Sequence, residues 1–215
     1  MRLFLSSQDL GHYAHIAREM AGDNPKAIFI KNAQDDLPED QRNFSNTQKL
    51  QMFNDAGFEP EMIDLRDYFG KKDKLAERMT GIGSFWSSGG NTFILRRAMK
   101  ASGLDEILKD MLARDEIMYG GWSAGACVAS TNLHGIEYGD RHTSDIVPDI
   151  YPIKETIWEG LGLVDFMIIP HCDQEWFEKN IEPTERHLNS LGRKFFKLND
   201  GQVVVVNGNK EELLT

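Results

Sequence analysis

The chain has 215 residues, 40% of them hydrophobic, which suits one α/β domain spanning residues 1–215. Its formal net charge of -10 argues against nucleic acid or an anionic membrane as a partner, since both need clustered Lys and Arg. The N-terminal apolar run is too short for a signal peptide, no stretch approaches a membrane span, and Cys127 and Cys172 form no disulfide framework. We therefore expect a cytoplasmic protein, either a monomer or a homodimer.

Strand and helix signals alternate through the first half of the chain. Expected strands cover residues 2–6, 27–30, 61–65 and 82–86, and expected helices cover 9–21, 47–56, 72–79, a segment continuing through Met99, and 104–112. This rhythm predicts a mostly parallel sheet with helices on both faces, a three-layer α/β fold. Ligands bind such sheets at the carboxyl ends of the strands.

The second half of the chain is less regular. Residues 131–160 contain several turn formers and little periodicity, which predicts a long loop or insertion that shapes a site. Residues 163–170 read as a strand and 184–191 as a helix. Residues 195–198 and 202–207 read as a hairpin across the turn at 199–201.

Ser123 lies between Gly121 and Gly125 after a short apolar segment, the pattern of a nucleophile elbow. A serine at the top of a sharp strand-to-helix turn has a strained backbone, and side chains two residues away would collide with neighbouring backbone. The helix that follows directs its free N–H groups at the reacting centre. A phosphate-binding loop or a plain tight turn is the alternative, although no Gly-Lys-Ser/Thr follows.

A serine nucleophile needs a base, and His171 is the best of six histidines. It ends an apolar strand directly after Pro170, at the sheet edge where the elbow is expected, whereas His134 and His142 in the long loop remain open. Spacing alone leaves the triad acid undecided among Glu137, Asp140, Asp145, Asp173 and Asp200.

The turn at Gly89 and Gly90 is a second glycine-rich connection from strand to helix. We expect the N–H groups of Gly90 and Ala124 to form an oxyanion hole, because two backbone donors can converge only where side chains are absent. Asn91 is a candidate for substrate binding, and it also suits the N-cap of the following helix.

Four motifs together resemble one known family. Gly89-Gly-Asn-Thr-Phe93, Gly121-Trp-Ser-Ala-Gly-Ala126, Pro170-His171 and Leu198-Asn-Asp-Gly201 occur in the order and approximate spacing of the dipeptidase E (aspartyl dipeptidase) family of serine peptidases. That family is related to cyanophycinase and to class I glutamine amidotransferase-like, flavodoxin-like folds. The resemblance runs from the first expected strand to the last.

The resemblance implies roles for individual residues. It makes Ser123 the nucleophile and His171 the base, with Asp200 in place of the glutamate of the family's Leu-Pro-Glu-Gly turn. Asp145 looks like a second acid considered catalytic in the family. The implied substrates are small peptides, including dipeptides with an N-terminal aspartate, for which Arg186 is the best candidate binding residue.

Two alternatives remain open. An esterase or amidase of the α/β-hydrolase class would place its acid between the serine and the histidine in sequence, as Asp145 lies, and would leave Asp200 dispensable. A non-enzymatic binding protein on the same fold is the other. We expect no metal and no cofactor, because no histidine pair has ligand spacing with a neighbouring carboxylate.

Overall fold

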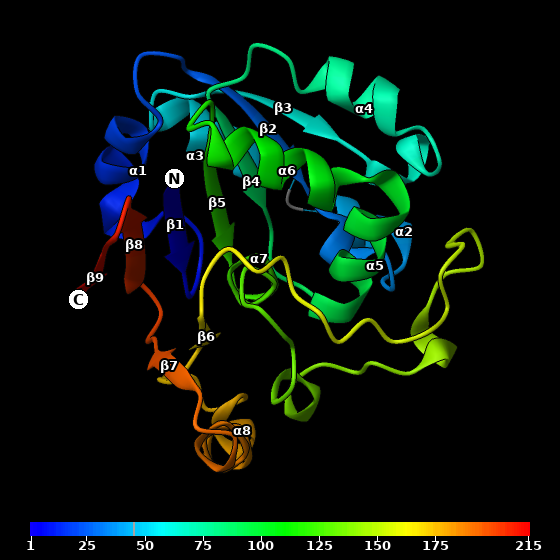
Figure 1. The fold of residues 1–215 in the computed structure, drawn as a ribbon, viewed down its shortest axis with the longest axis vertical. Helices are drawn as coiled ribbons and strands as arrows, with labels where there is room; N and C mark the ends of the chain where they lie inside the picture. Colours follow the sequence, from blue (N-terminus) through cyan, green and yellow to red (C-terminus); the bar gives the residue numbers. More distant parts are fainter. Residues whose placement is uncertain (45) are drawn as a thin grey trace.

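The computed structural model describes residues 1–44 and 46–215. Its main sheet has seven strands in the order β3-β2-β4-β5-β1-β8-β9 (Figure 1). The strands are β1 (Arg2–Ser6), β2 (Lys26–Ile30), β3 (Glu59–Ile63), β4 (Ser84–Ser87), β5 (Met118–Trp122), β8 (Val203–Asn207) and β9 (Lys210–Leu214). The first five in that order run parallel, and β8 and β9 are antiparallel to their neighbours. The predicted mostly parallel sheet is confirmed.

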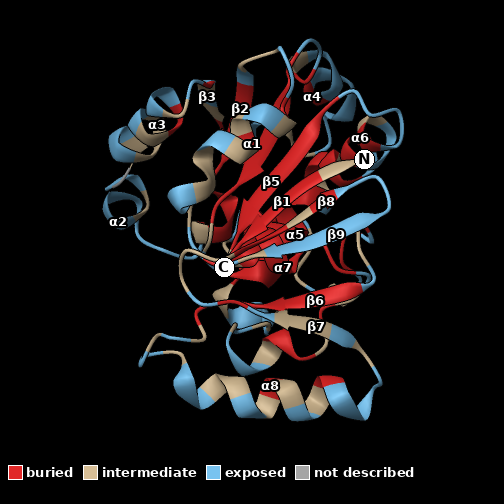
Figure 2. Ribbon diagram, turned by 90° about the vertical axis from the view of Figure 1, so that its left-hand side faces the viewer, coloured by how far each residue is buried: buried red, intermediate tan, exposed pale blue. Residues whose placement is uncertain are grey.

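Helices cover both faces of this sheet (Figure 2). Phe4 of β1 packs into a core with residues of α1 (Ala14–Met20) and α3 (Asn46–Asp55). Its neighbours Leu3 and Leu5 pack on the opposite face with residues of α4 (Lys72–Arg78), α5 (Thr92–Ser102) and α6 (Leu104–Ala113). This alternation follows from the two-residue period of a strand, and it produces the predicted three layers.

The chain between α6 and the last strands departs from regular structure. After the short helix α7 (Ala124–Cys127), the segment 131–165 contains the 3-10 turns Ile136–Tyr138 and Ser144–Ile146, in agreement with the predicted long loop. Three further 3-10 turns, Gly11–Tyr13, Asn32–Gln34 and Leu65–Tyr68, and the short helix α2 (Glu39–Asn43) lie in earlier connections. No helix of the described residues is long and apolar enough to cross a membrane.

The predicted hairpin of residues 195–198 and 202–207 is wrong. Instead β7 (Lys194–Lys197) pairs in parallel with β6 (Phe166–Ile169) in a separate two-stranded sheet, and α8 (Glu178–Ser190) makes the connection (Figure 1). The nearly continuous valine run of β8 is buried beside β1, where it forms a hairpin with β9 around Gly208. The turn at 199–201 therefore joins two sheets.

This topology brings two chain segments together at one edge. Because β6 and β7 are parallel, the residues that follow each strand lie side by side. The backbone continues the pairing beyond the strands, since Cys172 N–H donates to the carbonyl of Leu198 at 3.0 Å. His171 and Asp200, each just past a strand end, are thereby placed next to each other.

Candidate active site

Ser123 occupies a sharp turn between β5 and α7. Its backbone has φ 50° and ψ -115°, a strained conformation for a residue with a side chain. A Cβ at Gly121 would lie 2.4 Å from the carbonyl oxygen of Gly125, and one at Gly125 would lie 2.3 Å from that of Ser87. Tyr119 Oη also donates a buried hydrogen bond of 2.7 Å to the Gly125 carbonyl. Close backbone packing thus requires the glycines and fixes the turn.

The turn at Gly89 and Gly90 lies against Ser123. A Cβ at Gly89 would be 3.0 Å from Ser123 Cβ and 3.4 Å from Ser123 Oγ. Gly90 has φ +140°, and a Cβ there would be 2.3 Å from the carbonyl oxygen of Ala33. Within the described chain, neither the Gly90 N–H nor the Ala124 N–H makes a hydrogen bond. Both donors are therefore free to bind a ligand.

His171 has an acidic partner. Its Nδ1 lies 2.7 Å from Asp200 Oδ1, and both side chains are mostly buried, with 11% and 18% of their surfaces exposed. Its backbone has φ 59°, so it is a second strained residue with a side chain. The aromatic rings of Trp176 and Phe177 flank the imidazole at centroid distances of 4.9 and 5.9 Å. These contacts fix the ring orientation and the tautomer that carries a proton on Nδ1.

The end of β1 connects Ser123 to His171. Ser123 N–H donates to the carbonyl of Ser6 at 3.1 Å, and His171 N–H donates to Ser7 Oγ at 2.8 Å. The two candidate catalytic residues therefore flank the same strand end. Their side chains do not form a hydrogen bond to each other, as is common in ligand-free sites, where such bonds tighten when substrate binds.

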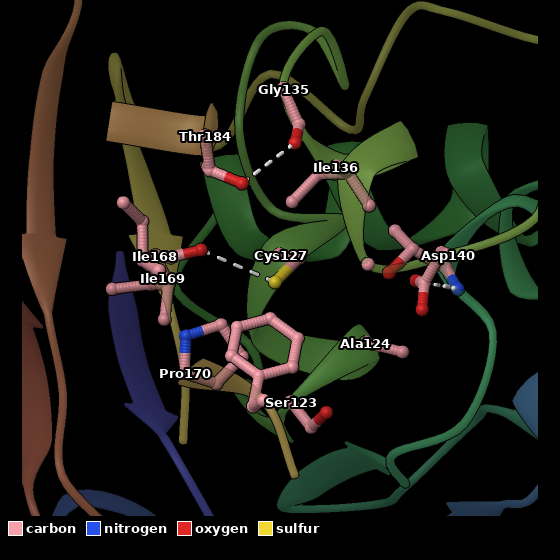
Figure 3. Close-up of a pocket in the computed structure, with 13 residues that line it drawn as sticks. Ser123, Ala124, Cys127, Gly135, Ile136, Asp140, Ile168, Ile169, Pro170 and Thr184 are labelled. Atoms are coloured by element: carbon pink, nitrogen blue, oxygen red, sulfur yellow. Dashed lines mark hydrogen bonds between the residues drawn. The ribbon is translucent and has the colours of Figure 1, made fainter. Parts of the chain in front are cut away.

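A cavity opens beside Ser123 (Figure 3). Its walls are mostly apolar and include Ile136 from the long loop, Ile168 and Ile169 from β6, and Phe177. No Lys or Arg is among its described lining residues. The cavity therefore suits an uncharged group better than a carboxylate.

Asp140 is the acidic residue among the described residues that line this cavity (Figure 3). Its Oδ2 accepts a hydrogen bond of 2.8 Å from the Thr92 backbone N–H. Burial is the main cause that raises the pKa of Asp140 to about 6, and the Thr92 contact opposes this shift. The cavity therefore contains one carboxyl group whose pKa lies above its usual range.

Two predicted residues, Asp145 and Arg186, lie outside the cavity. Asp145 is exposed and bonds to Arg141 and Thr143, and it is not among the residues lining the cavity. Arg186 is exposed on α8 and pairs with Glu182. These placements do not favour Asp145 as the acid or Arg186 as a substrate ligand.

Asn91 acts as the N-cap of α5. Its Oδ1 accepts hydrogen bonds from the N–H groups of Phe93 and Ile94, each at 3.0 Å, and its Nδ2 donates to the carbonyl of Arg141 at 2.8 Å. Both ends of the amide are engaged. The structure favours the capping role over substrate binding.

The sequence did not reveal two features of the site. Ser7 was not predicted as a site residue, although its position directly after the first strand could have indicated that it lies at the ligand-binding edge of the sheet. Asp140 was one of five candidate acids from spacing alone, and the family resemblance placed Asp200 and Asp145 above it. Spacing cannot tell which loop carboxylate turns inward. Only the fold separates Asp140 from Asp145.

The model of peptidase family S51 matches residues 3–214. The chain belongs to peptidase family S51. This confirms the resemblance inferred from the four sequence motifs.

Two curated relatives are similar in sequence to part of this chain. An uncharacterized peptidase of Listeria monocytogenes serovar 1/2a is 27% identical over 130 residues, which cover 60% of this chain and 57% of the relative. The probable alpha-aspartyl dipeptidase of Drosophila melanogaster is 30% identical over 132 residues, which cover 59% of this chain and 50% of the relative. The chain thus matches about half the length of these relatives.

Two solved structures share the fold of this S51 protein over nearly its whole length. A protein of Listeria monocytogenes EGD-e assigned to peptidase E has a TM-score of 0.76 and 20% identity, covering 99% of this chain and 97% of that one. A peptidase from an acI-B1 Actinobacterium has a TM-score of 0.70 and 17% identity, and the match covers 100% of this chain and 93% of that one. At these identities the likeness establishes the fold alone.

Proposed function

We propose that the protein is a serine peptidase of the dipeptidase E type, which hydrolyses small peptides through an acyl-enzyme. The observation that carries the proposal is the 2.7 Å contact of His171 Nδ1 with Asp200 Oδ1, next to a strained serine at the same strand end. In this assignment Ser123 is the nucleophile, His171 the general base and Asp200 the acid that orients it. Membership in family S51 supports the reaction class.

The chemistry proceeds in two halves. Ser123 Oγ attacks the peptide carbonyl carbon while its proton passes to His171 Nε2, and Asp200 stabilises the resulting imidazolium through Nδ1–H. The tetrahedral intermediate collapses as His171 gives that proton to the leaving amine, which breaks the C–N bond. Water then attacks the acyl-enzyme with His171 again as base, releasing the carboxylic acid and restoring Ser123.

The oxyanion hole of this mechanism consists of the N–H groups of Gly90 and Ala124. Neither N–H group has a hydrogen-bond partner among the described residues, which leaves both free to bind the oxyanion. Gly89 lets the turn lie close against Ser123, since a Cβ there would be 3.0 Å from Ser123 Cβ. Removing one such donor in other enzymes costs about 100- to 1,000-fold in kcat.

We propose that uncharged side chains are preferred next to the scissile bond. The apolar cavity walls and the carboxylate of Asp140 disfavour an acidic substrate side chain, because like charges repel in a site of low dielectric. Dipeptides with an N-terminal aspartate, indicated by the motif resemblance and by the name of the Drosophila relative, are the competing substrate class.

A dipeptide panel tests the proposal. Asp-X, Glu-X, Arg-X, Leu-X and Gly-X are offered to wild type, to Ser123→Ala, and to Ser144→Ala as a matched control at an exposed serine. We expect turnover highest on Leu-X or Gly-X, unchanged in Ser144→Ala and reduced by several powers of ten in Ser123→Ala. Highest turnover on Asp-X would overturn the side-chain preference and keep the peptidase assignment.

Labelling with a fluorophosphonate separates the remaining alternatives. Stoichiometric labelling of Ser123 is expected, because this reagent needs an activated serine. Full dipeptidase activity in Ser123→Ala would overturn the nucleophile assignment. Absence of both labelling and turnover would favour a binding protein on this fold, and labelling with turnover only of esters would favour an esterase.

A further inference from the structure

Two histidines and a glutamate meet close to residues that line the cavity. His134 and Glu137 lie in the long loop and His187 lies on α8, yet one ligand atom from each falls within 4.8 Å of the others. All three side chains are reachable from solvent. None of them has a role in the proposed peptide hydrolysis, so this cluster needs a separate explanation.

Neighbouring side chains orient both imidazoles. The ring of His134 stacks on Trp158 at a centroid distance of 4.4 Å and an interplanar angle of 8°. The ring of His187 lies nearly parallel to that of His134, at 6.3 Å and 10°. Tyr138 Oη lies 3.3 Å from His187 Nδ1, which leaves Nε2 of that ring for another ligand. Such outer contacts are typical of metal-binding histidines, whose second nitrogen is held by a polar group.

The glutamate is likewise held in place. Glu137 Oε2 accepts a hydrogen bond of 2.5 Å from the Gly135 N–H, which leaves Oε1 for a cation. Two imidazole nitrogens and one carboxylate oxygen are a donor set that suits Zn²⁺, with water in the fourth position. Zn²⁺ binds such atoms at about 2.0–2.2 Å, so the three donors, which lie within 4.8 Å of one another, would move closer together around the ion.

We propose that His134, Glu137 and His187 bind a zinc ion that fastens the long loop to α8. The two segments already touch, since Thr184 Oγ1 donates to the Gly135 carbonyl at 3.2 Å, and both of these residues line the cavity (Figure 3). A metal on the neighbouring residues would hold this wall of the cavity in one position. The site is independent of the catalytic assignment, because its ligands lie outside the triad.

Metal titration of the purified full chain tests the site. Zn²⁺ should raise the thermal midpoint by roughly 5–10 °C at about 100 times its dissociation constant, because it binds the folded state. Substituted Co²⁺ should give the visible absorption bands of a tetrahedral ion. Calorimetry should find one site per chain.

Variants distinguish this site from general binding to surface histidines. His187→Asn and His134→Gln should each weaken Zn²⁺ binding by at least about 10- to 100-fold and abolish the Co²⁺ bands. The matched control is the double variant His12→Gln and His15→Gln, an exposed pair at the start of the chain, which should bind as wild type does. Unchanged affinity in both ligand variants, or equal loss in the control, would overturn the proposal. Thermal midpoints without metal show that each variant is folded.

Discussion

Ser7 Oγ donates a hydrogen bond of 2.8 Å to Asp200 Oδ1, the same oxygen that contacts His171 Nδ1. Ser7 Oγ also accepts the backbone N–H of His171 at 2.8 Å. One hydroxyl at the end of β1 therefore fixes both the carboxylate and the backbone of the histidine. This makes Ser7 a positioning residue for the proposed triad.

The variant Ser7→Ala should lower kcat by about tenfold with little change in KM. The hydroxyl touches Asp200 and His171, and a hydrogen bond to a charged group contributes about 1.5–3 kcal/mol. The exposed Ser190→Ala is the control, and Ser7→Thr, which keeps the hydroxyl, should recover part of the rate. A kcat equal to that of wild type would contradict the positioning role.

Replacing the candidate acids separates Asp200 from Asp145. Asp200→Asn should lower kcat by about 1,000- to 10,000-fold, because the amide favours the wrong imidazole tautomer. Asp145→Asn should retain nearly full activity, since this side chain is exposed and paired with Arg141. The reverse ranking would support an α/β-hydrolase order of catalytic residues. Circular dichroism checks that both variants fold.

Gly90→Ala should destabilise the protein by roughly 2–4 kcal/mol, because an added Cβ meets backbone in a strained conformation. The new methyl group would lie 2.3 Å from the Ala33 carbonyl oxygen at φ +140°. Gly162→Ala is the control for backbone strain alone, since Gly162 has φ +66° and no atom lies within 4 Å of an added Cβ. This control should lower the free energy of unfolding by about 1 kcal/mol. Urea unfolding measures both free energies, and equal losses would contradict the steric argument.

The stability of the protein should fall as pH rises through about 6, because of Asp140. Its folded-state pKa is raised to about 6, whereas an unfolded Asp titrates near 3.9. The folded state therefore binds this proton more tightly, so the stabilisation is complete below about pH 4 and is lost above about pH 6.

Asp140→Asn should remove this part of the pH dependence. The amide oxygen can still accept the hydrogen bond from the Thr92 N–H, and it carries no charge. The free energy of unfolding of the variant should therefore exceed that of wild type by about 1–2 kcal/mol at pH 8, a value reduced for the partial exposure of the side chain. Urea midpoints at pH 5 and pH 8 measure the effect, with Asp145→Asn as control. A pH dependence identical to that of wild type would contradict the assignment to Asp140.

Local patterns were sufficient for much of the fold. The first strand and the alternation of strands and helices follow from short-range periodicity, as confirmed by β1 at Arg2–Ser6 and by helices on both faces. The turn at Ser123 was also predictable, because Gly121 and Gly125 each lie two residues from the serine, where an added side chain would meet backbone. The single-domain organisation stays a prediction.

Pairing between distant segments was not predictable in the same way. The apolar stretches that became β7 and β8 read as a hairpin because a turn separates them, yet β8 is buried beside β1 and β7 joins β6. Helix α8 begins at Glu178 rather than near Thr184 and contains Pro183, which the propensity rules disfavour. Burial against remote strands outweighed these local signals.

The sequence by itself determined the candidate nucleophile, the histidine at the end of a strand and the glycine turn beside them, because each depends on residues close together in the chain. Only the tertiary structure decided which carboxylate contacts His171, that Ser7 supports the pair, and that His134, Glu137 and His187 meet. Those contacts join segments far apart in the chain. Their distances depend on how the strands and α8 pack, and spacing along the chain does not predict that packing.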